Sequence, residues 1–262
     1  MADDFTHRAL RAAGKPVHRM GLACNYGIDG RGFARAVERG VNYFFWTPFR
    51  TGAVTPVLVE KLKADRARYV VATGPTLGFF GGGVRSGCEK LLRALGTDYL
   101  DVFQLFWLGV TSALTDGTVD ELQKLKAEGK IRSIGVSIHD RERAGRLAED
   151  SAFDLFMIRY NAAHPGAERD IFPHLAKRQP SVTAYTATSW RKLLKRPRGW
   201  TGDAMTAGDC YRFCLSSPHV DVVLTGPADE RELDENLSAL DKGPLTDDEM
   251  KWMRDFGRAV HG

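Results

Sequence analysis

The chain has 262 residues, 43% of them hydrophobic, which is enough to bury one large core and suits a single α/β barrel domain over residues 1–262, since such barrels take about 250 residues. The formal net charge of +4 comes from 37 Lys and Arg against 33 Asp and Glu spread along the chain, so the composition gives no case for nucleic-acid binding. No run reaches the roughly 20 apolar residues of a membrane helix, and Met1–Gly14 has no apolar signal core, so we expect a cytoplasmic protein without a membrane partner.

The first half of the chain predicts a hairpin followed by alternating strands and helices. Ala13-Gly14-Lys15-Pro16 predicts the turn of a hairpin within Arg8–Leu22. Thr55 and Pro56 predict a helix start, with the threonine as N-cap and the proline in the first turn. The expected strands are Met20–Cys24, Val41–Trp46, Tyr69–Thr73 and Tyr99–Phe106, and the expected helices include Gly32–Arg39, ending at Gly40, and Arg85–Leu95, ending at Gly96.

The second half continues the alternation. Thr118-Val-Asp-Glu121 and Thr246-Asp-Asp-Glu249 match the capping box and predict helix starts, the second for a C-terminal helix. Leu193–Gly208 is the least patterned stretch, and we expect a loop there. The remaining strands are expected at Arg132–Ile138, Asp154–Tyr160, Ser181–Thr186 and Asp221–Thr225, and helices near Arg141–Glu149, Glu168–Lys177, Ala207–Leu215 and Glu230–Leu240.

Eight strand–helix repeats with short connections require parallel strands and right-handed crossovers. Closing the repeats gives a (β/α)8 TIM barrel, an α/β fold, with an N-terminal β-hairpin and an extra C-terminal helix. The working face of such a barrel lies at the C-terminal ends of its strands.

The four cysteines predict neither disulfides nor a metal site. Cys24, Cys88, Cys210 and Cys214 show no paired framework and no metal-ligand spacing. Cys210 and Cys214 lie four residues apart on one face of a predicted helix, where we expect them to belong to the core.

Two segments show a family resemblance. Gly96–Trp107 reads GTDYLDVFQLFW and Gly129–His139 reads GKIRSIGVSIH; each is a helix stop followed by the apolar run of a strand buried on both faces. Together they resemble the aldo-keto reductase family, in which the corresponding strands read roughly DYLDLYLLHW and GKIRYIGVSN. The resemblance extends over nearly the whole chain and implies an oxidoreductase with a nicotinamide cofactor.

The resemblance also implies a catalytic tetrad, and the chain departs from it. In the family a Tyr gives the proton, a Lys salt-bridged to an Asp lowers the pKa of that Tyr, and a His orients the substrate oxygen. The four matching positions hold Phe45 (Trp46 if one residue is inserted), Phe49, Gly74 and Phe106. Because hydride arriving at a carbonyl carbon requires an acid at the oxygen, we expect the standard carbonyl-reducing machinery to be absent.

Cofactor features are retained in part. Ser137 matches the serine that hydrogen-bonds the nicotinamide amide, but Ile138 and Met157 replace its usual Asn and Gln companions. Tyr185 matches the tyrosine that stacks on the nicotinamide ring, although a packed strand-end aromatic residue fits equally well. The resemblance therefore implies NADP(H) or NAD(H) binding, weaker than in complete members.

The end of the chain resembles the region that closes the cofactor site. Gly226, within Leu224–Ala228, matches a phosphate loop beside a helix N-terminus, which suits an anion. Glu235 and Asn236 match an adenine-contact pair, while Glu232 occupies the place of the basic residue that contacts a 2′-phosphate. The basic residues Arg191, Lys192, Lys195, Arg196 and Arg198 offer a phosphate clamp, or else an ordinary solvated loop.

Other polar and aromatic residues follow the predicted strands. His139, His164 and Arg50 are speculative catalytic groups, although ordinary loop histidines explain the first two as well. Arg159 and Asn161 are further polar groups expected at the mouth. The expected aromatic surroundings are Phe45, Trp46, Phe49, Phe106 and Trp107, with Phe79 and Phe80 from a glycine-rich loop, and they suit a flat or apolar small-molecule ligand.

Three functional hypotheses stay open. The first is an oxidoreductase of this descent that binds a nicotinamide cofactor and works with different residues or on a different substrate. The second is a non-catalytic relative, a pseudoenzyme that binds a ligand or a protein partner through the same barrel mouth. The third is a non-redox enzyme, such as a lyase or cyclase, that uses the aromatic pocket.

Overall fold

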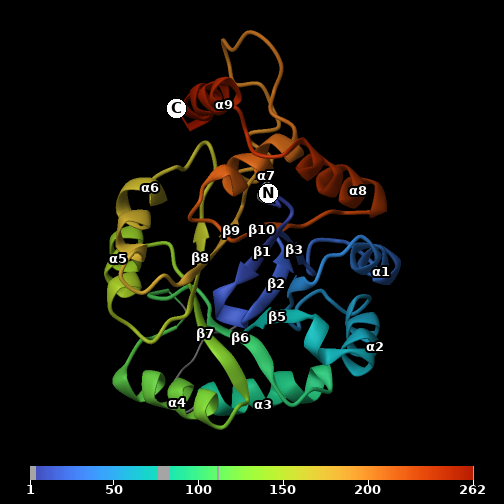
Figure 1. Ribbon diagram of the computed structural model, residues 1–262, viewed down its shortest axis with the longest axis vertical. Coiled ribbons are helices and arrows are strands. Elements are labelled where there is room, and N and C mark those ends of the chain that lie inside the picture. Colours follow the sequence, from blue (N-terminus) through green and yellow to red (C-terminus); the bar gives the residue numbers. More distant parts are fainter. Residues whose placement is uncertain (1–3, 76–82, 111, 262) are drawn as a thin grey trace.

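Eight strands close into a barrel in which every strand runs parallel to its neighbours (Figure 1). The structure is a computed structural model that describes residues 4–75, 83–110 and 112–261. The barrel closes because β10 pairs with both β9 and β3. Its strands are β3 (Met20–Ala23), β4 (Tyr43–Phe45), β5 (Val70–Thr73), β6 (Leu100–Leu105), β7 (Ile131–Ser137), β8 (Leu155–Arg159), β9 (Ser181–Tyr185) and β10 (Val222–Thr225). The predicted barrel is confirmed, with each strand within two residues of its expected ends.

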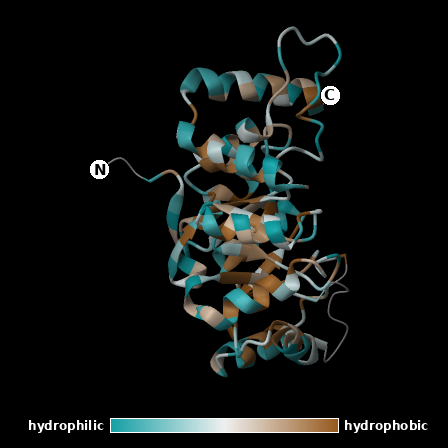
Figure 2. Cartoon of the chain, turned by 90° about the vertical axis from the view of Figure 1, so that its right-hand side faces the viewer, coloured by the Kyte–Doolittle hydropathy of each residue, from teal (hydrophilic) through white to brown (hydrophobic). Residues whose placement is uncertain are grey.

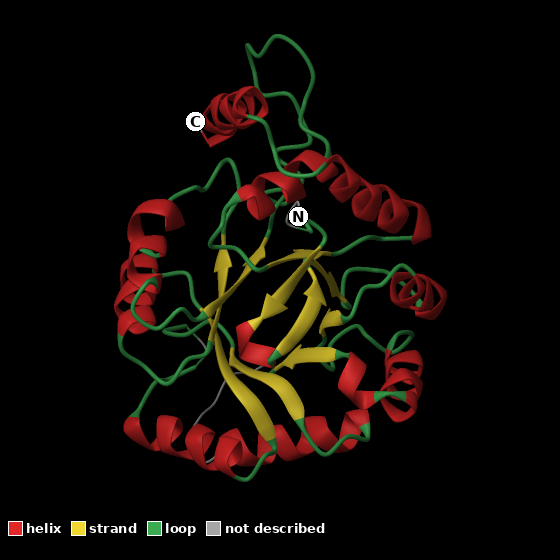
Figure 3. Cartoon of the chain, in the orientation of Figure 1, coloured by secondary structure: helices red, strands yellow, loops and turns green. Residues whose placement is uncertain are grey.

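Helices surround the barrel as an outer ring (Figure 3). Gly40, Gly96 and Gly129 follow helix ends with φ of +90°, +59° and +75°, the left-handed conformation that glycine adopts without strain. The α-helices are α1 (Gly30–Glu38), α2 (Thr55–Ala64), α3 (Gly83–Leu95), α4 (Asp116–Ala127), α5 (Arg141–Glu149), α6 (Ala167–Asp170), α7 (Ala207–Ser216), α8 (Glu230–Ser238) and α9 (Asp247–His261), and the 3-10 turns are η1 (Arg11–Ala13), η2 (Arg66–Arg68), η3 (Phe172–Leu175) and η4 (Ala239–Lys242). Within the described ranges, no helix is both long and apolar enough to cross a membrane.

The strands are buried on both faces, so the molecule has two apolar cores. The larger lies between strands and helices and includes Phe44 and Val71. The smaller fills the barrel itself and includes Phe45, Val70 and Ala72. Alternate residues of one strand thus enter different cores, and the hydrophobic colouring concentrates on the central strands (Figure 2).

The N-terminal hairpin covers the end of the barrel at which the strands begin (Figure 1). It consists of β1 (His7–Leu10) and β2 (Lys15–His18), joined by η1. Leu10 and Val17 belong to the core inside the barrel. The backbone N–H of Ala12 donates to the Ser181 hydroxyl at 3.1 Å, and the Ser133 hydroxyl donates to the Ala12 carbonyl. The predicted hairpin is therefore confirmed and closes the bottom of the barrel.

Three aspartates hold adjacent strands together at this same end. Asp101, Asp154 and Asp221 each stand at or just before the start of a strand, and each accepts a hydrogen bond from a backbone N–H of the preceding strand in the barrel and pairs with a basic side chain. The backbone donors are Val71 (2.9 Å), Ile134 (2.9 Å) and Val182 (2.8 Å), and the basic partners are Arg66 (2.7 Å), Lys126 (2.6 Å) and Arg8 (3.3 Å). Charge-assisted hydrogen bonds of this kind are among the stronger ones in proteins.

Two predicted helix starts are wrong in detail. Thr55 is the first residue of α2 and not its N-cap; its hydroxyl donates to the Thr51 carbonyl at 2.8 Å, and Pro56 occupies the first turn. Thr115, not Thr118, caps α4, accepting from the Thr118 N–H at 3.2 Å. The capping-box pattern selects Thr118, with Glu121 three residues later, but α4 begins at Asp116 and so takes its cap from Thr115.

The helix expected at Glu168–Lys177 is interrupted. It divides into α6 and η3, because Pro173 has no N–H to continue an α-helical ladder and fits the first turn of the 3-10 segment. The helix expected to reach Leu240 likewise ends as η4 after Ser238.

The C-terminal helix α9 lies outside the helix ring, next to the long loop before α7 (Figure 1). The Thr246–Glu249 capping box is confirmed by both of its reciprocal hydrogen bonds, at 2.8 and 3.2 Å. Trp200 of the loop meets Phe256 of α9 edge to face, with centroids 5.1 Å apart. The stretch expected to be a loop is one, and it is anchored by this contact.

Candidate functional site

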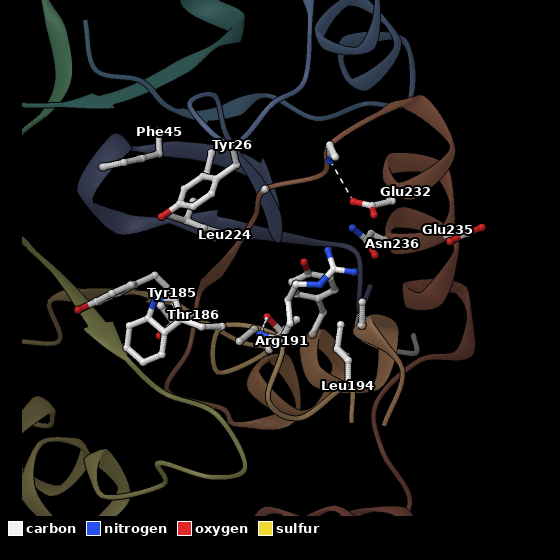
Figure 4. Close-up of a pocket in the computed structure, with 18 of the residues that line it drawn as sticks. Tyr26, Phe45, Tyr185, Thr186, Arg191, Leu194, Leu224, Glu232, Glu235 and Asn236 are labelled. Carbon is white, nitrogen blue, oxygen red and sulfur yellow. Dashed lines mark hydrogen bonds between the residues drawn. The ribbon is translucent and has the colours of Figure 1, made fainter. Parts of the chain in front are cut away.

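A cavity of about 650 Å³ opens at the C-terminal ends of the strands and extends to α8 (Figure 4). One end is lined by Phe45 and Tyr185, the last residues of β4 and β9, and by Met157 in the middle of β8; the other end is lined by Glu235 and Asn236 of α8. This volume lies within the range of about 300–1,000 Å³ that is typical of small-molecule sites. The cavity therefore combines an apolar end in the barrel mouth with a polar end at the helix.

The strand register places several predicted residues at this rim. Ser137 pairs with Met157 across β7 and β8, and Arg159 pairs with Tyr185 across β8 and β9. Burial is the main cause that raises the pKa of Tyr185 to about 12, so the Tyr185 hydroxyl is neutral at physiological pH. That hydroxyl lies 3.2 Å from both ring nitrogens of His139. The Tyr185 side chain also lines the cavity.

Aromatic side chains occupy the tetrad-matching strand ends. Phe45 and Phe106 are 9% and 6% exposed, and their rings meet edge to face at 5.6 Å. A Cβ atom added to Gly74 would overlap the Gln104 carbonyl oxygen and lie 2.9 Å from the Phe106 ring. Phe45, not Trp46, faces the barrel interior, because Trp46 belongs to the outer core.

Phe49 and Arg50 lie apart from the cavity. Phe49 is 59% exposed on the loop after β4, and the Arg50 guanidinium lies 5.8 Å from the centroid of its ring. Neither residue lines the cavity. The structure thus brings together Phe45, Gly74 and Phe106 among the predicted positions but leaves this pair outside.

The loop after β9 has an unusual backbone. Thr186, Ser189, Trp190 and Arg191 have φ of +54°, +49°, +52° and +68°. Such left-handed non-glycine residues cost on the order of 1–3 kcal/mol each and cluster at ligand clamps. Thr186, Trp190 and Arg191 line the cavity.

Of the basic run, Arg191 alone faces this cavity among the five residues considered. The other four are exposed on the loop surface: Lys192, Lys195, Arg196 and Arg198. The predicted clamp is therefore reduced to one arginine, and the rest of the run is a solvated surface.

The start of α8 is already occupied by the carboxylates of the chain itself. Asp229 caps the helix and accepts from the Glu232 N–H at 2.8 Å, and Glu232 accepts from the Ala228 N–H at 3.0 Å (dashed in Figure 4). Gly226 fits tightly, since a Cβ atom there would lie 2.8 Å from the Tyr26 side chain. Two amides at this helix start, those of Ala228 and Glu232, are therefore paired with carboxylates of the chain, while the match of Gly226 to a phosphate loop stays a prediction.

The two α8 residues matched to adenine contacts differ in environment. Asn236 is 7% exposed and donates to the Thr225 hydroxyl at 3.0 Å. Glu235 is exposed and accepts from Arg231 at 2.7 Å. Asn236 is thus held in place at the cavity wall, whereas Glu235 is exposed and paired with Arg231.

The candidate histidines lie at the rim. Burial lowers the pKa of His164 to about 4, with the nearby Arg159 as the next cause, and the His164 ring lies 3.2 Å from the Asn161 side-chain oxygen. The pKa of His139 is also lowered, by burial and by Arg159. Both imidazoles are therefore neutral near pH 7, and neither is poised to donate a proton as an imidazolium.

The cysteines lie in the interior of the molecule. Cys24, Cys88, Cys210 and Cys214 are buried and free, so the expected core role of the last two is confirmed. In the part of the chain that the structure describes, no three His, Cys, Asp or Glu residues group as a metal site requires. Phe79 and Phe80 lie outside the described residues.

Sequence reasoning missed several lining residues, and two of them are exposed aromatic side chains. Tyr26, on the loop after β3, and Trp190, on the loop after β9, are 62% and 58% exposed and line the cavity. The available signal was their position just after predicted strands, at the C-terminal face where barrel sites form.

The chain is similar in sequence to known proteins. A sequence profile described as the Aldo/keto reductase family matches residues 34–196. Methylglyoxal reductase YeaE of Escherichia coli (strain K12) is 36% identical over 104 residues, which are 38% of this chain and 36% of that protein. The chain thus matches about a third of the length of this curated relative.

Solved structures resemble the chain over almost its full length. The apo form of aldo-keto reductase AKR11C1 from Bacillus halodurans superposes with a TM-score of 0.81 at 21% identity, covering 97% of this chain and 96% of that one. An aldo-keto reductase from Klebsiella pneumoniae in complex with NADPH gives a TM-score of 0.76 at 23% identity, covering 96% and 95%. At such identities these similarities establish the fold alone.

Proposed function

Since the chain belongs to the aldo/keto reductase family, we propose that it binds NADP(H) or NAD(H) weakly in the cavity and lacks the standard carbonyl-reducing tetrad. The absence of the tetrad is supported by the residues at three of its matching positions, which are Phe45, Gly74 and Phe106. No atom of these three side chains can donate a proton or carry a positive charge. A lysine does not fit at position 74 in this backbone, because its Cβ would overlap the Gln104 carbonyl.

The described residues suit a dinucleotide in several respects. The cavity is continuous from the barrel mouth to α8. Tyr185 offers an aromatic side chain at the mouth, Arg191 a positive charge along the wall, and Asn236 a fixed amide at the far end. A reduced nicotinamide, when bound, supplies a hydride. The chain's own contribution is to bind and orient the cofactor and to exclude water with the Phe45–Phe106 pair.

Binding is expected to be weaker than in complete family members. Ile138 is 2% exposed and Met157 is 7% exposed, and neither side chain offers a strong hydrogen bond to the nicotinamide carboxamide. Each missing hydrogen bond costs on the order of 1 kcal/mol. Ser137 and Tyr185 are the matched residues that remain.

Titration with NADPH and NADH tests the cofactor proposal. Tryptophan fluorescence should change saturably, because Trp190 lines the cavity, and the change should shrink in Trp190→Phe while calorimetry gives a similar Kd. Trp252→Phe, on α9 outside the cavity, is the matched control. If neither nucleotide binds by calorimetry up to millimolar concentration, the proposal fails, and the ligand-binding pseudoenzyme or the lyase or cyclase hypothesis takes its place.

Activity tests the missing tetrad. NADPH and NADH oxidation should be very slow across a broad panel of simple aldehydes and ketones, because losing a positioned general acid typically costs about 10²–10⁴ in rate. A second, independent purification excludes contaminating reductases. Turnover near about 1–10 s⁻¹ on any simple carbonyl would contradict the proposal and show that other residues, such as His139, had taken over the acid's role.

A further inference from the structure

Arg159, at the end of β8, is a partly buried cation without an anionic partner. Among the described residues, its guanidinium makes neither a hydrogen bond nor an ion pair; its one recorded contact is the Trp190 ring, with a centroid distance of 5.7 Å. Two other sheltered arginines have carboxylate partners: Arg212 pairs with Glu249 at 2.8 Å, and Arg66 with Asp101 at 2.7 Å. An anion that entered the barrel mouth would therefore find the Arg159 guanidinium unpaired and able to donate hydrogen bonds.

The strand geometry directs Arg159 into the barrel mouth. Leu155 and Met157 of β8 belong to the core inside the barrel, whereas Ile158 belongs to the outer core. Arg159 follows this alternation, on the same side as Met157, which lines the cavity. Its Cα partner across the sheet is Tyr185, so the two side chains stand next to each other on one face.

Two more hydrogen-bonding groups converge with the guanidinium. The Tyr185 hydroxyl lies 3.2 Å from the His139 ring, two residues beyond Ser137 at the end of β7. Arg159 is the second cause, after burial, that lowers the pKa of His139, and it acts on the pKa of Tyr185 and His164 as well. The positive charge therefore acts on all three groups. Because His139 and Tyr185 hydrogen-bond to each other, one N–H or O–H of the neutral pair stays available to a ligand.

One exposed aromatic side chain adjoins this cluster. Among the large hydrophobic residues that are exposed in the described part of the chain, Trp190 is the one whose ring is recorded next to Arg159, at 5.7 Å. Trp190 covers Arg159 and also lines the cavity. A ligand anchored at Arg159 thus has an aromatic side chain next to it and the apolar mouth below.

We propose that Arg159, with His139 and Tyr185, forms a subsite for the carboxylate of an aromatic organic acid. A guanidinium matches a carboxylate bidentately, and Trp190 packs against the body of the acid. The proposal rests on the proposed function only in placing this acid beside the cofactor-binding cavity, which Tyr185 and Trp190 line and Arg159 adjoins; its test needs no nucleotide.

The test compares an acid with its neutral analogue. Phenylpyruvate and phenylacetone differ in a carboxylate against a methyl group, and each is titrated calorimetrically into the protein without nucleotide. Phenylpyruvate should bind at least about 10-fold more tightly, since a hydrogen-bonded charge pair typically contributes about one to two decades of affinity. Equal Kd values for the two compounds, or no binding of phenylpyruvate at millimolar concentration, would overturn the subsite.

Variants then assign the charge to Arg159. Arg159→Met should weaken phenylpyruvate binding about 10- to 100-fold and leave phenylacetone binding within about 2-fold, with Arg159→Lys in between. Arg146→Met removes an exposed arginine on α5 and should change nothing. Unchanged phenylpyruvate affinity in Arg159→Met would refute the proposal; if that variant does not fold, the ratio of the two Kd values in Arg159→Gln decides in the same way.

The outcome is separable from that of the cofactor proposal. NADH titration of the same variants, without acid, reports on nucleotide binding alone. Binding of phenylpyruvate through Arg159 without binding of nucleotide would support this subsite and contradict the proposed function. Binding of nucleotide without binding of phenylpyruvate would support the proposed function and contradict the subsite.

Discussion

The rings of Phe45 and Phe106 meet edge to face at the barrel mouth, with centroids 5.6 Å apart and planes at 81°. Aromatic pairs in this arrangement contribute about 0.5–1.5 kcal/mol beyond the apolar area that they bury. The pair joins the ends of β4 and β6 and belongs to the core inside the barrel. The mouth is thus the top layer of that core, so a catalytic residue restored there replaces a packed core side chain.

Phe106→His alone should recover little carbonyl reduction, less than about 10-fold in kcat/KM on simple aldehydes, because a proton donor and its cation would still be missing. The variant should also lose about 1–3 kcal/mol of unfolding free energy, as imidazole replaces a buried ring without an assured partner. Steady-state kinetics and urea unfolding measure the two effects. A gain above about 100-fold would show that histidine was the missing component.

Gly74→Ala should destabilise the barrel by about 1–3 kcal/mol, because the new Cβ would overlap the Gln104 carbonyl and approach the Phe106 ring to 2.9 Å. Gly52→Ala is the matched control, since nothing lies within 4 Å of a Cβ there, and it should stay within about 0.5 kcal/mol. Urea unfolding compares both with the parent chain. Equal stability of the two variants would mean that β5 and β6 can separate at the mouth without cost.

Glu232→Gln should favour NADPH over NADH by about 3- to 10-fold in relative Kd. The Glu232 carboxylate lines the cavity at the start of α8, where it repels a 2′-phosphate, and glutamine keeps an acceptor for the Ala228 N–H that Glu232 now binds at 3.0 Å. Calorimetric titration with both nucleotides measures the ratio, and Glu142→Gln, on α5, is the control. An unchanged ratio would place the adenosine end of the cofactor elsewhere.

Stability should fall in mild acid because of His18. Burial lowers the pKa of His18 from 6.5 to about 4, and the side chain is 5% exposed. Between pH 6.5 and 4 the His18 imidazole is protonated in the unfolded chain but largely neutral in the folded chain. Protonation therefore stabilises the unfolded state, and the free energy of unfolding falls by about 3 kcal/mol over this interval. His164 has a similar shift, so the effect is isolated by subtraction.

The subtraction compares the parent chain with His18→Gln by urea unfolding at pH 7 and pH 4. The variant should lose less stability than the parent over this interval, because glutamine does not titrate. Identical losses in the two proteins would show that the pKa of His18 is the same in the folded and the unfolded chain, which would contradict the prediction.

Sequence patterns predicted the barrel well because its signals repeat. Each strand is an apolar run bounded by a turn, and glycines such as Gly96 and Gly129 end helices in a conformation that other residues avoid. Local chemistry was less decisive. Thr115 and Thr118 compete for one helix start, and the effect of Pro173 depends on whether the segment is α-helical or 3-10.

The candidate site was predictable at strand ends and less so in loops. Phe45, Phe106 and Tyr185 lie near the C-terminal rim, as the order of strands required. The pairing of the α8 amides with Asp229 and Glu232 was not foreseen, because the same acidic residues fit both a capped helix and an open anion site until the loop geometry is known. The isolation of Arg159 is a property of three neighbouring strands together, so no local pattern reports it.

The three aspartates at the bottom of the barrel carry a consequence for how this molecule can change. Asp101, Asp154 and Asp221 fasten strands together at the end remote from the cavity. These hydrogen bonds and ion pairs share no residue with the mouth. Loops around the mouth can therefore be exchanged or lengthened while the barrel stays closed. The chain is therefore a suitable scaffold for transplanted ligand-binding loops.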